Sequence, residues 1–295
     1  MSRFVQESIA IPPLGLGMAP IGKHPEADAK AIVQVAWDGG ARYYDTAPLY
    51  GGGLSESRAG RALKGRDRAA YMVSTKVGAY LDGERRYSDH SFDTTMRSFE
   101  ESLGRLDLEM VDILYIHDPA ERIDVALRGS YAAAERLRGE GRVGAVGVGV
   151  NTVEEGLAFV RESDISVLML AGRYTLLDTS AERELLPRCL ERGVQVVAAG
   201  VFNSGILTGR SKAFDYRPAD DEIERRAALL RDVADRWAVP LGAVAMAFSR
   251  SHPAVTSIVV GASSAVQLRE VLSWSRIEIP AGLWSELADY GLFRY

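Results

Sequence analysis

The sequence of 295 residues predicts a (β/α)8 TIM barrel, a closed parallel eight-stranded barrel ringed by helices. Two observations predict it: short β-branched runs alternate with amphipathic stretches, and no linker or low-complexity tract divides the chain. A doubly wound sheet is the competing architecture. It is disfavoured because residues 15–20, Gly-Leu-Gly-Met-Ala-Pro, do not complete the Gly-rich dinucleotide fingerprint expected after its first strand. We therefore expect one domain over residues 1–295.

The expected strands are short runs rich in Val, Ile and Tyr. They cover residues 14–16, 41–44, 70–74, 111–116, 143–150, 167–170, 194–199 and 257–260. The expected helices repeat apolar residues every three or four positions, as Phe92, Met96, Phe99 and Leu103 do. They cover residues 27–38, 55–63, 91–106, 125–137, 153–161, 181–192, 222–237 and 265–274.

The composition, 47% hydrophobic and 25% charged, is typical of a globular protein with a sizeable core. No apolar run approaches the ~18–20 residues of a membrane-spanning helix, and the N-terminal residues lack the apolar run of a signal peptide. The single cysteine, Cys189, excludes an internal disulfide and fits a reducing compartment. Forty acidic against 35 basic side chains, without a basic run, argue against a nucleic-acid surface. We expect a cytoplasmic enzyme with a small-molecule substrate and no nucleic-acid or membrane partner; the oligomeric state is not indicated.

Polar side chains follow three successive predicted strands, where a barrel of this type carries its functional residues. Asp45 and Tyr50 follow the second strand, Lys76 the third and His117 the fourth. A lysine paired to a carboxylate would lower the pKa of a nearby tyrosine, and a histidine could hydrogen-bond a substrate oxygen. Each residue alone is commonly structural, as a cap, a loop aromatic or a satisfied core histidine. Together they predict a proton-transfer site with Tyr50 as general acid or base.

Four segments carry a closer resemblance: Asp45-Thr46-Ala47-Pro48-Leu49-Tyr50-Gly51, Ser55-Glu56, Ser74-Thr75-Lys76 and residues 112–117. They closely resemble the aldo-keto reductase superfamily. The resemblance implies a (β/α)8 barrel, a nicotinamide cofactor bound without a Rossmann domain, and a catalytic tetrad of Asp45, Tyr50, Lys76 and His117.

Finer details in residues 47–51, 116–119, 147–151, 171–177 and 201–205 are similar to aldose 1-dehydrogenases of the L-fucose (D-threo-aldose) type and to pyridoxal 4-dehydrogenases. The resemblance implies oxidation of an aldose at C1 to the lactone, with Tyr50 as the base. The alternatives are an NADPH-dependent aldehyde or ketone reductase, a pyridoxal 4-dehydrogenase, or a non-catalytic nicotinamide-binding regulatory subunit. The intact tetrad argues against the regulatory subunit.

The segment after the last predicted strand offers N–H groups and hydroxyls at the start of a helix, which suit a phosphate, although the same pattern is often a plain helix cap. The resemblance makes this the dinucleotide phosphate segment and makes residues 201–209 a loop over the pyrophosphate. The implied contacts are Gly261, Ala262, Ser263, Gln267, Ser204, Gly205 and Leu207. No lysine or arginine stands in 261–267 to pair with a 2′-phosphate, so NAD is expected in preference to NADP.

The positions that ordinarily hold the nicotinamide amide differ in this chain, and Asn151, with Arg173, is our hypothesis for its replacement. Segment 78–90 and the C-terminal residues 292–295 are expected to line the substrate pocket. The remaining histidines lack partners at metal-ligand spacing, so no metal site is expected.

Overall fold

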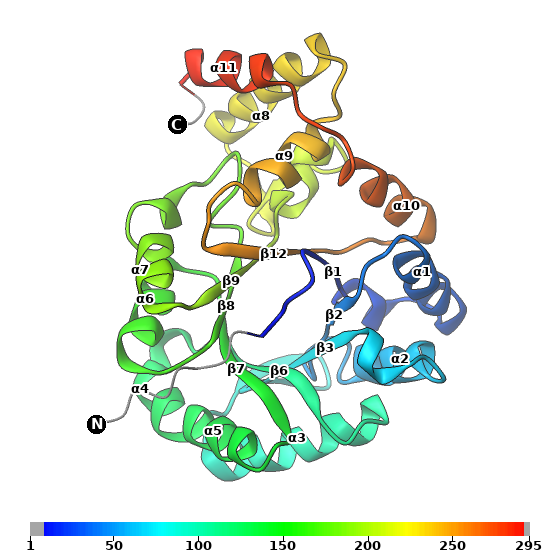
Figure 1. Cartoon of the computed structure of the whole chain (residues 1–295), viewed down its shortest axis with the longest axis vertical. Helices are drawn as coiled ribbons and strands as arrows, with labels where there is room; N and C mark the ends of the chain where they lie inside the picture. Colours follow the sequence, from blue (N-terminus) through cyan, green and yellow to red (C-terminus); the bar gives the residue numbers. More distant parts are fainter. Residues whose placement is uncertain (1–8, 292–295) are drawn as a thin grey trace.

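The computed structural model describes residues 9–291, and the expected C-terminal contribution to the pocket lies outside them. Eight parallel strands close into a barrel in the order β1-β12-β9-β8-β7-β6-β3-β2, which confirms the predicted fold class (Figure 1). The barrel strands are β1 (Leu14–Gly17), β2 (Tyr43–Asp45), β3 (Met72–Val77), β6 (Val111–His117), β7 (Val143–Val150), β8 (Val167–Ala171), β9 (Gln195–Ala199) and β12 (Val255–Val260).

Five strands reach further than predicted at their C-terminal ends, among them β1, which extends to Gly17, and β8, which extends to Ala171. β2 extends to Asp45, β3 to Val77 and β6 to His117. Asp45, Lys76 and His117 are therefore strand residues, and only Tyr50 of the four lies in a loop.

Helices surround the barrel. They are α1 (Glu26–Asp38), α2 (Leu54–Leu63), α3 (Phe92–Leu106), α4 (Ile123–Ala126), α5 (Ala132–Gly139), α6 (Val153–Glu162), α7 (Leu185–Arg192), α8 (Asp221–Arg236), α9 (Leu241–Ser249), α10 (Ala265–Trp274) and α11 (Ala281–Asp289). A π-helical turn at Leu127–Tyr131 joins α4 to α5. Short 3-10 turns occur at Pro20–Lys23, Arg68–Ala70, Ala120–Arg122, Ser180–Glu182 and Asn203–Thr208.

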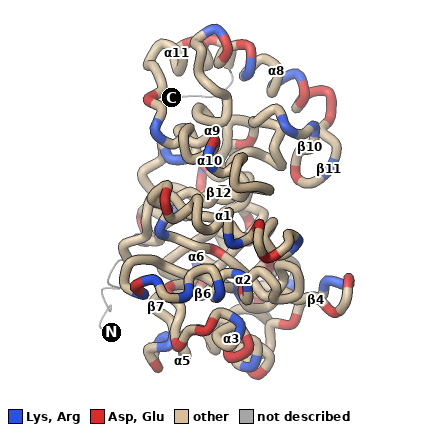
Figure 2. The backbone as a smooth tube through the Cα atoms, turned by 90° about the vertical axis from the view of Figure 1, so that its right-hand side faces the viewer, with Lys and Arg blue, Asp and Glu red and all other residues tan. Residues whose placement is uncertain are grey.

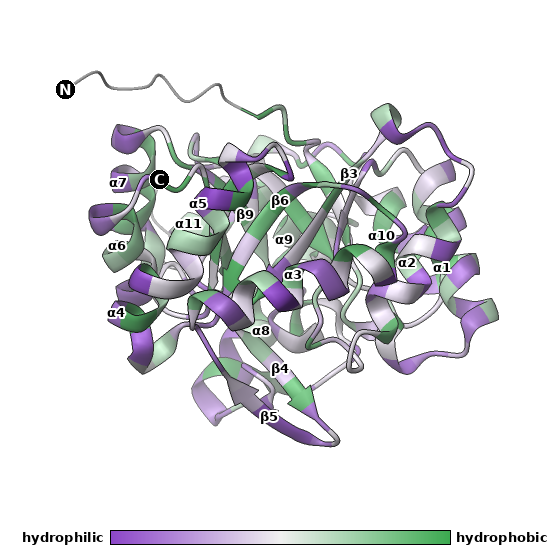
Figure 3. Ribbon diagram, turned by 90° about the horizontal axis from the view of Figure 1, so that it is seen from below, coloured by the Kyte–Doolittle hydropathy of each residue, from purple (hydrophilic) through white to green (hydrophobic). Residues whose placement is uncertain are grey.

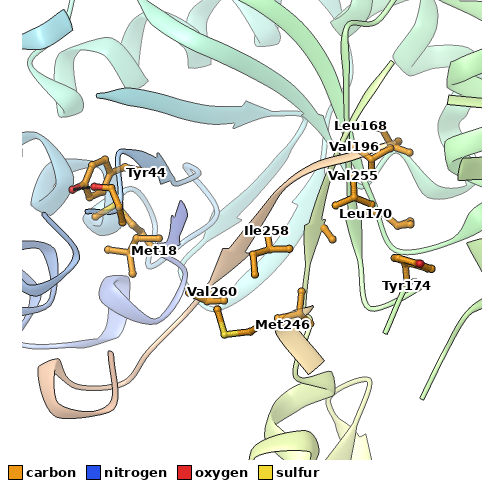
Figure 4. Packing of buried hydrophobic residues seen from close by; sticks show 14 of the residues in the cluster. Met18, Tyr44, Leu168, Leu170, Tyr174, Val196, Met246, Val255, Ile258 and Val260 are labelled. Atoms are coloured by element: carbon orange, nitrogen blue, oxygen red, sulfur yellow. Dashed lines mark hydrogen bonds between the residues drawn. The ribbon is translucent and has the colours of Figure 1, made fainter. Parts of the chain in front are cut away.

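The prediction of eight helices was incomplete, because α9 and α11 were missed. Eight of the nine residues of α9 are buried, so this helix has no polar face and no 3.6-residue pattern to detect. Met246 of α9 lies beside Ile258 and Val260 of β12 (Figure 4). The predicted helix, α8, contacts α9 and α11 and lies further from the barrel (Figure 1). The apolar α9 therefore covers this part of the barrel, and the amphipathic α8 covers α9.

The interior of the barrel is filled by inward-facing side chains, among them Tyr43, Ile113, Tyr115 and Met169. Residues 9–13 cross the end of the barrel where the strands begin, and Ile11 packs into this interior cluster. The Gln195 amide donates to the Ile9 carbonyl at 2.9 Å. This end is therefore closed, and the opposite end carries the polar strand ends.

Two small antiparallel sheets lie in the loops that follow the barrel strands. β4 (Ala79–Asp82) and β5 (Arg85–Ser88) form a hairpin after β3, and it projects from one end of the barrel (Figure 3). β10 (Ala213–Phe214) pairs with β11 (Arg217–Pro218) in the loop after β9. Acidic and basic residues are interleaved along the outer helices and the hairpin (Figure 2). Within the described residues, no helix is both long and apolar enough to cross a membrane.

Candidate active site

The two-residue repeat of a β-strand brings the predicted strand residues together. Tyr43 faces the barrel interior, so Asp45, two residues later, faces the same way. In the same way, Tyr115 of β6 faces the interior, so His117, two residues later, also faces it. In the barrel register Asp45 lies opposite Ser74, and Lys76 lies opposite Tyr115. Strand geometry therefore collects Asp45, Lys76 and His117 at the interior end of three neighbouring strands.

Asp45 and Lys76 form a buried ion pair. The Lys76 Nζ atom lies 2.7 Å from Asp45 Oδ1, 2.6 Å from Oδ2, and 2.9 Å from the carbonyl oxygen of Thr46. Burial alone would lower the pKa of Lys76, but the adjacent carboxylate of Asp45 outweighs it, and the net pKa is raised. The lysine is therefore charged and donates hydrogen bonds to Asp45 and Thr46.

A chain of hydroxyl groups lies beneath this ion pair. Ser74 Oγ donates to Asp45 Oδ1 at 2.7 Å. Tyr43 Oη lies 2.9 Å from Ser74 Oγ and 3.1 Å from Tyr115 Oη. Burial raises the pKa values of both tyrosines, so both remain neutral phenols. This network orients the carboxylate of Asp45 from below, and the sequence pattern gave no indication of it.

Tyr50 lies above the ion pair, in the loop that leaves β2. Lys76 Nζ is 4.8 Å from the centre of the tyrosine ring. The ring of His117 is 5.8 Å away, centre to centre, and perpendicular to it. Burial raises the pKa of Tyr50 to about 12, although the charge of Lys76 acts in the opposite direction. We expected the lysine to set a lowered pKa; its effect has the expected sign, but burial is larger.

The loop that carries Tyr50 turns through three glycines with φ angles of 64°, 61° and 88° at Gly51, Gly52 and Gly53. A Cβ atom on Gly51 would lie 2.6 Å from the carbonyl oxygen of Gly22, so a larger residue has no room there. The Thr46 hydroxyl donates to Ser55 Oγ at 2.8 Å and fixes the far side of the loop. The tyrosine position is therefore set by backbone packing.

His117 is the last residue of β6 and is buried. Burial lowers its pKa to about 3, against the smaller opposing effect of the carboxylate of Asp118. The imidazole is therefore neutral at pH 7 and presents one donor and one acceptor. Its Nδ1 atom has no hydrogen-bond partner among residues 9–291, and its Nε2 atom is 3.8 Å from Asp118 Oδ2.

A cavity of about 350 Å³ opens at the ends of β7, β8 and β9. Its lining includes Asn151, Ala171, Gly172, Arg173, Gly200, Asn203, Ser204, Asp215, Tyr216 and Arg217. Asn203, Ser204 and Gly205 have φ angles of 42°, 58° and 94°, so the backbone bends sharply here. The buried Asn203 Oδ1 atom has no partner in the described part of the chain. A cavity with an unsatisfied acceptor in its wall is suited to a ligand that carries a hydrogen-bond donor.

The structure places the predicted cofactor residues in different settings. Asn151 and Ser204 line the cavity, and Gly205 forms part of its bent rim. The side chain of Leu207 is fully buried in the core, so only its backbone remains available for a ligand. Asn203 also lines the cavity, but the sequence analysis did not predict it. Its position directly before the predicted contact Ser204 could have indicated it.

The segment 261–267 caps the helix α10. The Gln267 side-chain carbonyl accepts from the Ser263 N–H at 2.7 Å, and Ser264 Oγ accepts from the Gln267 N–H at 3.1 Å. Gly261 is exposed, whereas the side chain of Ala262 is buried. The Ser263 N–H group, a predicted phosphate donor, is therefore already hydrogen-bonded within the protein.

Arg173 has partners within the protein on three sides. It donates to the Asn151 carbonyl at 2.7 Å, to Asp178 at 2.7 Å and to Asp215 at 2.5 Å. Asp215 lies in the turn between β10 and β11, so Arg173 ties that loop to the end of β8. Its guanidinium stabilises the cavity wall, and the hypothesised contact with the nicotinamide stays a prediction. Across the described residues, no cluster of three metal-ligating side chains occurs.

Comparison with known proteins identifies the family of this chain. The profile of the aldo/keto reductase family matches residues 13–290. The chain belongs to the aldo/keto reductase family. It is an oxidoreductase, and its family uses a nicotinamide cofactor.

The chain is also similar to individual proteins in sequence and in structure. The chain is 39% identical to a D-threo-aldose 1-dehydrogenase from a Pseudomonas species, over 95% of this chain and 94% of the relative. It is 36% identical to a pyridoxal 4-dehydrogenase from Microbacterium luteolum, over 96% and 95%. An aldo-keto reductase from Bacillus halodurans, solved in its holo form, superposes with a TM-score of 0.84 at 27% identity, covering 99% and 96% of the two chains.

Proposed function

We propose that this aldo/keto reductase oxidises an aldose of the L-fucose or D-threo type at C1 to the lactone. The observation that carries the proposal is the buried Asp45–Lys76 ion pair with Tyr50 and His117 directly around it. The 39% identity to a D-threo-aldose 1-dehydrogenase supports the substrate class. Removing a proton and a hydride from an anomeric centre requires the acid–base group that this arrangement supplies.

In the proposed reaction, Tyr50 takes the proton of the anomeric hydroxyl as the C1–H bond breaks and the C1=O bond of the lactone forms. The oxidised nicotinamide, when bound, supplies a hydride acceptor and a positive charge. Lys76 stabilises the phenolate form of Tyr50. The neutral imidazole of His117 donates a hydrogen bond to the substrate oxygen and holds it toward the phenol.

The cavity at the ends of β7, β8 and β9 fits a nicotinamide cofactor. Its unsatisfied Asn203 Oδ1 atom is an acceptor of the kind that an amide N–H₂ requires. Ser204 and Asn151 add polar groups to the same wall. Segment 261–267 presents no cation to a 2′-phosphate, and this supports NAD as the preferred cofactor, with NADP used less well.

The pyridoxal 4-dehydrogenase relative, at 36% identity, favours a second candidate substrate for the same residues. Pyridoxal also presents a hydroxyl-bearing carbon in its hemiacetal form, so the proton and hydride steps would be the same. An aldehyde reductase would use the same site in reverse, with the protonated Tyr50 as the acid.

The test is NADH formation with L-fucose, D-arabinose, L-galactose and pyridoxal, each with NAD and with NADP. We expect sugar oxidation with NAD and a rate that increases with pH. The reason for the pH dependence is that the pKa of Tyr50 is raised to about 12, so the basic form becomes more abundant as pH rises. Oxidation of pyridoxal alone would move the assignment to the second candidate. Consumption of NADPH with simple aldehydes and no oxidation would contradict the proposal.

A further inference from the structure

Asp118 follows His117 directly and has an unusual backbone. Its φ angle is +45°, in the left-handed region that few non-glycine residues adopt. The Asp118 N–H donates to the carbonyl of Gly149 at 2.9 Å, which fixes this bend against the end of β7. The bend turns the carboxylate back toward the catalytic imidazole, with Oδ2 at 3.8 Å from His117 Nε2. The side chain is only 16% exposed.

The carboxylate of Asp118 is held by two other elements of the rim. The Asn151 amide, after β7, donates to Oδ1 at 2.7 Å. The guanidinium of Arg86, on β5 of the hairpin, donates to Oδ2. A carboxylate offers about four lone-pair sites, and these two bonds leave some of them for a ligand. The side chain of Arg86 is half exposed, so the Arg86–Asp118 ion pair lies at the solvent-facing side of the site.

The position of this group suits a second substrate hydroxyl. We propose that Asp118, supported by Arg86, accepts a hydrogen bond from the hydroxyl on the carbon next to the reacting carbon. An oxygen bound to His117 Nε2 and the oxygen on the adjacent carbon lie about one hydrogen-bond length apart, ~3 Å. His117 Nε2 and Asp118 Oδ2 are 3.8 Å apart, so each can bind one of two oxygens that lie on adjacent carbons.

The inference rests on the proposed function for the role of His117 and adds the substrate feature that the site selects. It makes the enzyme selective for 2-hydroxylated substrates over simple aldehydes. A deoxygenated substrate would leave the carboxylate with an unused acceptor, and hydrogen bonds to charged groups are strong. The matching donor on the sugar is neutral, so selection is by hydroxyl placement rather than by substrate charge.

The experiment removes the substrate 2-hydroxyl and the Asp118 carboxylate, separately and together. The kcat/KM for oxidation is measured for L-fucose and 2-deoxy-L-fucose with the wild-type enzyme and with Asp118→Asn. We expect removal of the 2-hydroxyl to reduce the wild-type value by about 10- to 100-fold. Asp118→Asn should reduce the L-fucose value by a similar factor and reduce the 2-deoxy value several-fold less. Equal losses on both sugars would show that Asp118 only positions His117 and would overturn the inference.

A matched ion pair provides the control. Asp124 and Arg128 are 79% and 77% exposed and pair at 3.8 Å on the outer helix segment. Asp124→Asn and Arg128→Gln make the same chemical changes as Asp118→Asn and Arg86→Gln, and neither should alter the ratio between the two sugars. Arg86→Gln should reduce that ratio by less than Asp118→Asn, since it acts through the carboxylate. Tm values of all variants monitor folding.

The inference and the proposed function fail in different ways. If no sugar is oxidised, the same comparison is run in reduction with glyceraldehyde and propanal, which differ by hydroxyl groups, one of them next to the carbonyl. A preference for glyceraldehyde that Asp118→Asn removes would support the hydroxyl contact while the aldose proposal fails. An absence of preference in the wild-type enzyme, in either direction of the reaction, would overturn the inference.

Discussion

The two sides of the barrel rim are built differently. On the side of β2, β3 and β6, Asp45, Lys76 and His117 are buried strand residues, and only Tyr50 comes from a loop. Hydrogen bonds of 2.6 to 2.7 Å join Asp45 to Ser74 and Lys76. On the side of β7, β8 and β9, they lie in bent loops around a cavity of about 350 Å³. Arg173 and Asp215 close that side with an ion pair whose aspartate is 38% exposed.

The roles that we propose for the two sides account for this difference. A proton-transfer group needs a fixed environment, and burial within a closed barrel supplies it because strand positions cannot shift independently. A large ligand must enter and leave, and partly exposed ion pairs are weak enough to open at little cost. Five substitutions and one double variant test this contrast, and their expected effects range from about 10³- to 10⁴-fold in kcat to less than tenfold in KM.

Tyr50→Phe tests the proton-transfer side most directly. It removes the hydroxyl that we propose as the acid–base group and keeps the ring, so kcat should fall by about 10³- to 10⁴-fold while Tm stays close to the wild-type value. Tyr290→Phe removes a hydroxyl from the end of α11 and serves as the control, with activity unchanged. A Tyr50→Phe enzyme that retains a tenth of its activity would place the acid–base group elsewhere.

Breaking the Asp45–Lys76 pair should lower stability in addition to activity, because Lys76 also acts on Tyr50. Asp45→Ala or Lys76→Met leaves a buried charge without its partner and should lower the free energy of unfolding by about 3–5 kcal/mol. Because the folded pKa of Lys76 is raised, its contribution is complete below the ordinary lysine value and is lost only as pH rises through the folded value. Chemical denaturation measures both effects.

The double variant sharpens this prediction. Asp45→Ala with Lys76→Met leaves no unpaired charge, so it should cost less than the sum of the single changes. Additive losses would mean that the two residues are not energetically coupled in the folded protein.

Ser74→Ala should have an intermediate effect. The change removes the hydroxyl that links Asp45 to Tyr43 and should cost about 1–3 kcal/mol of unfolding free energy. Ser257→Ala is the matched control, because Ser257 Oγ is equally buried in a barrel strand and has no partner within residues 9–291. Equal Tm shifts for the two variants would show that the network beneath Asp45 contributes nothing.

Arg173→Gln, on the cavity side, should have the smallest effect on the kinetic parameters. Loss of its bonds to Asp178 and Asp215 frees the β10–β11 loop, so the KM for the cofactor should rise by less than tenfold, with kcat little changed. Arg142→Gln removes an arginine paired to Glu100 at the other end of the barrel and provides the control. A large decrease in kcat would contradict the division of roles between the two sides.

Much of the fold and of the proton-transfer side could be predicted from local patterns. Alternating strands and amphipathic helices predicted the barrel, and the residues at three strand ends predicted Asp45, Tyr50, Lys76 and His117 as one cluster. This succeeds because parallel strands end at the same rim, so position along each strand already determines position in space. The apolar helix α9 escaped prediction since a helix buried on all sides carries no periodic signal.

The sequence by itself determined the barrel and the chemical types gathered at its rim. Only the tertiary structure decided the sign of the pKa shift of Tyr50, the partners of Arg173 and the orientation of the Asp118 carboxylate toward the imidazole of His117. Those properties depend on desolvation and on contacts between loops that are far apart in the chain, such as Arg86 with Asp118 and Arg173 with Asp215. Local sequence patterns carry no record of such distances, because burial and long-range pairing exist only once the barrel has closed.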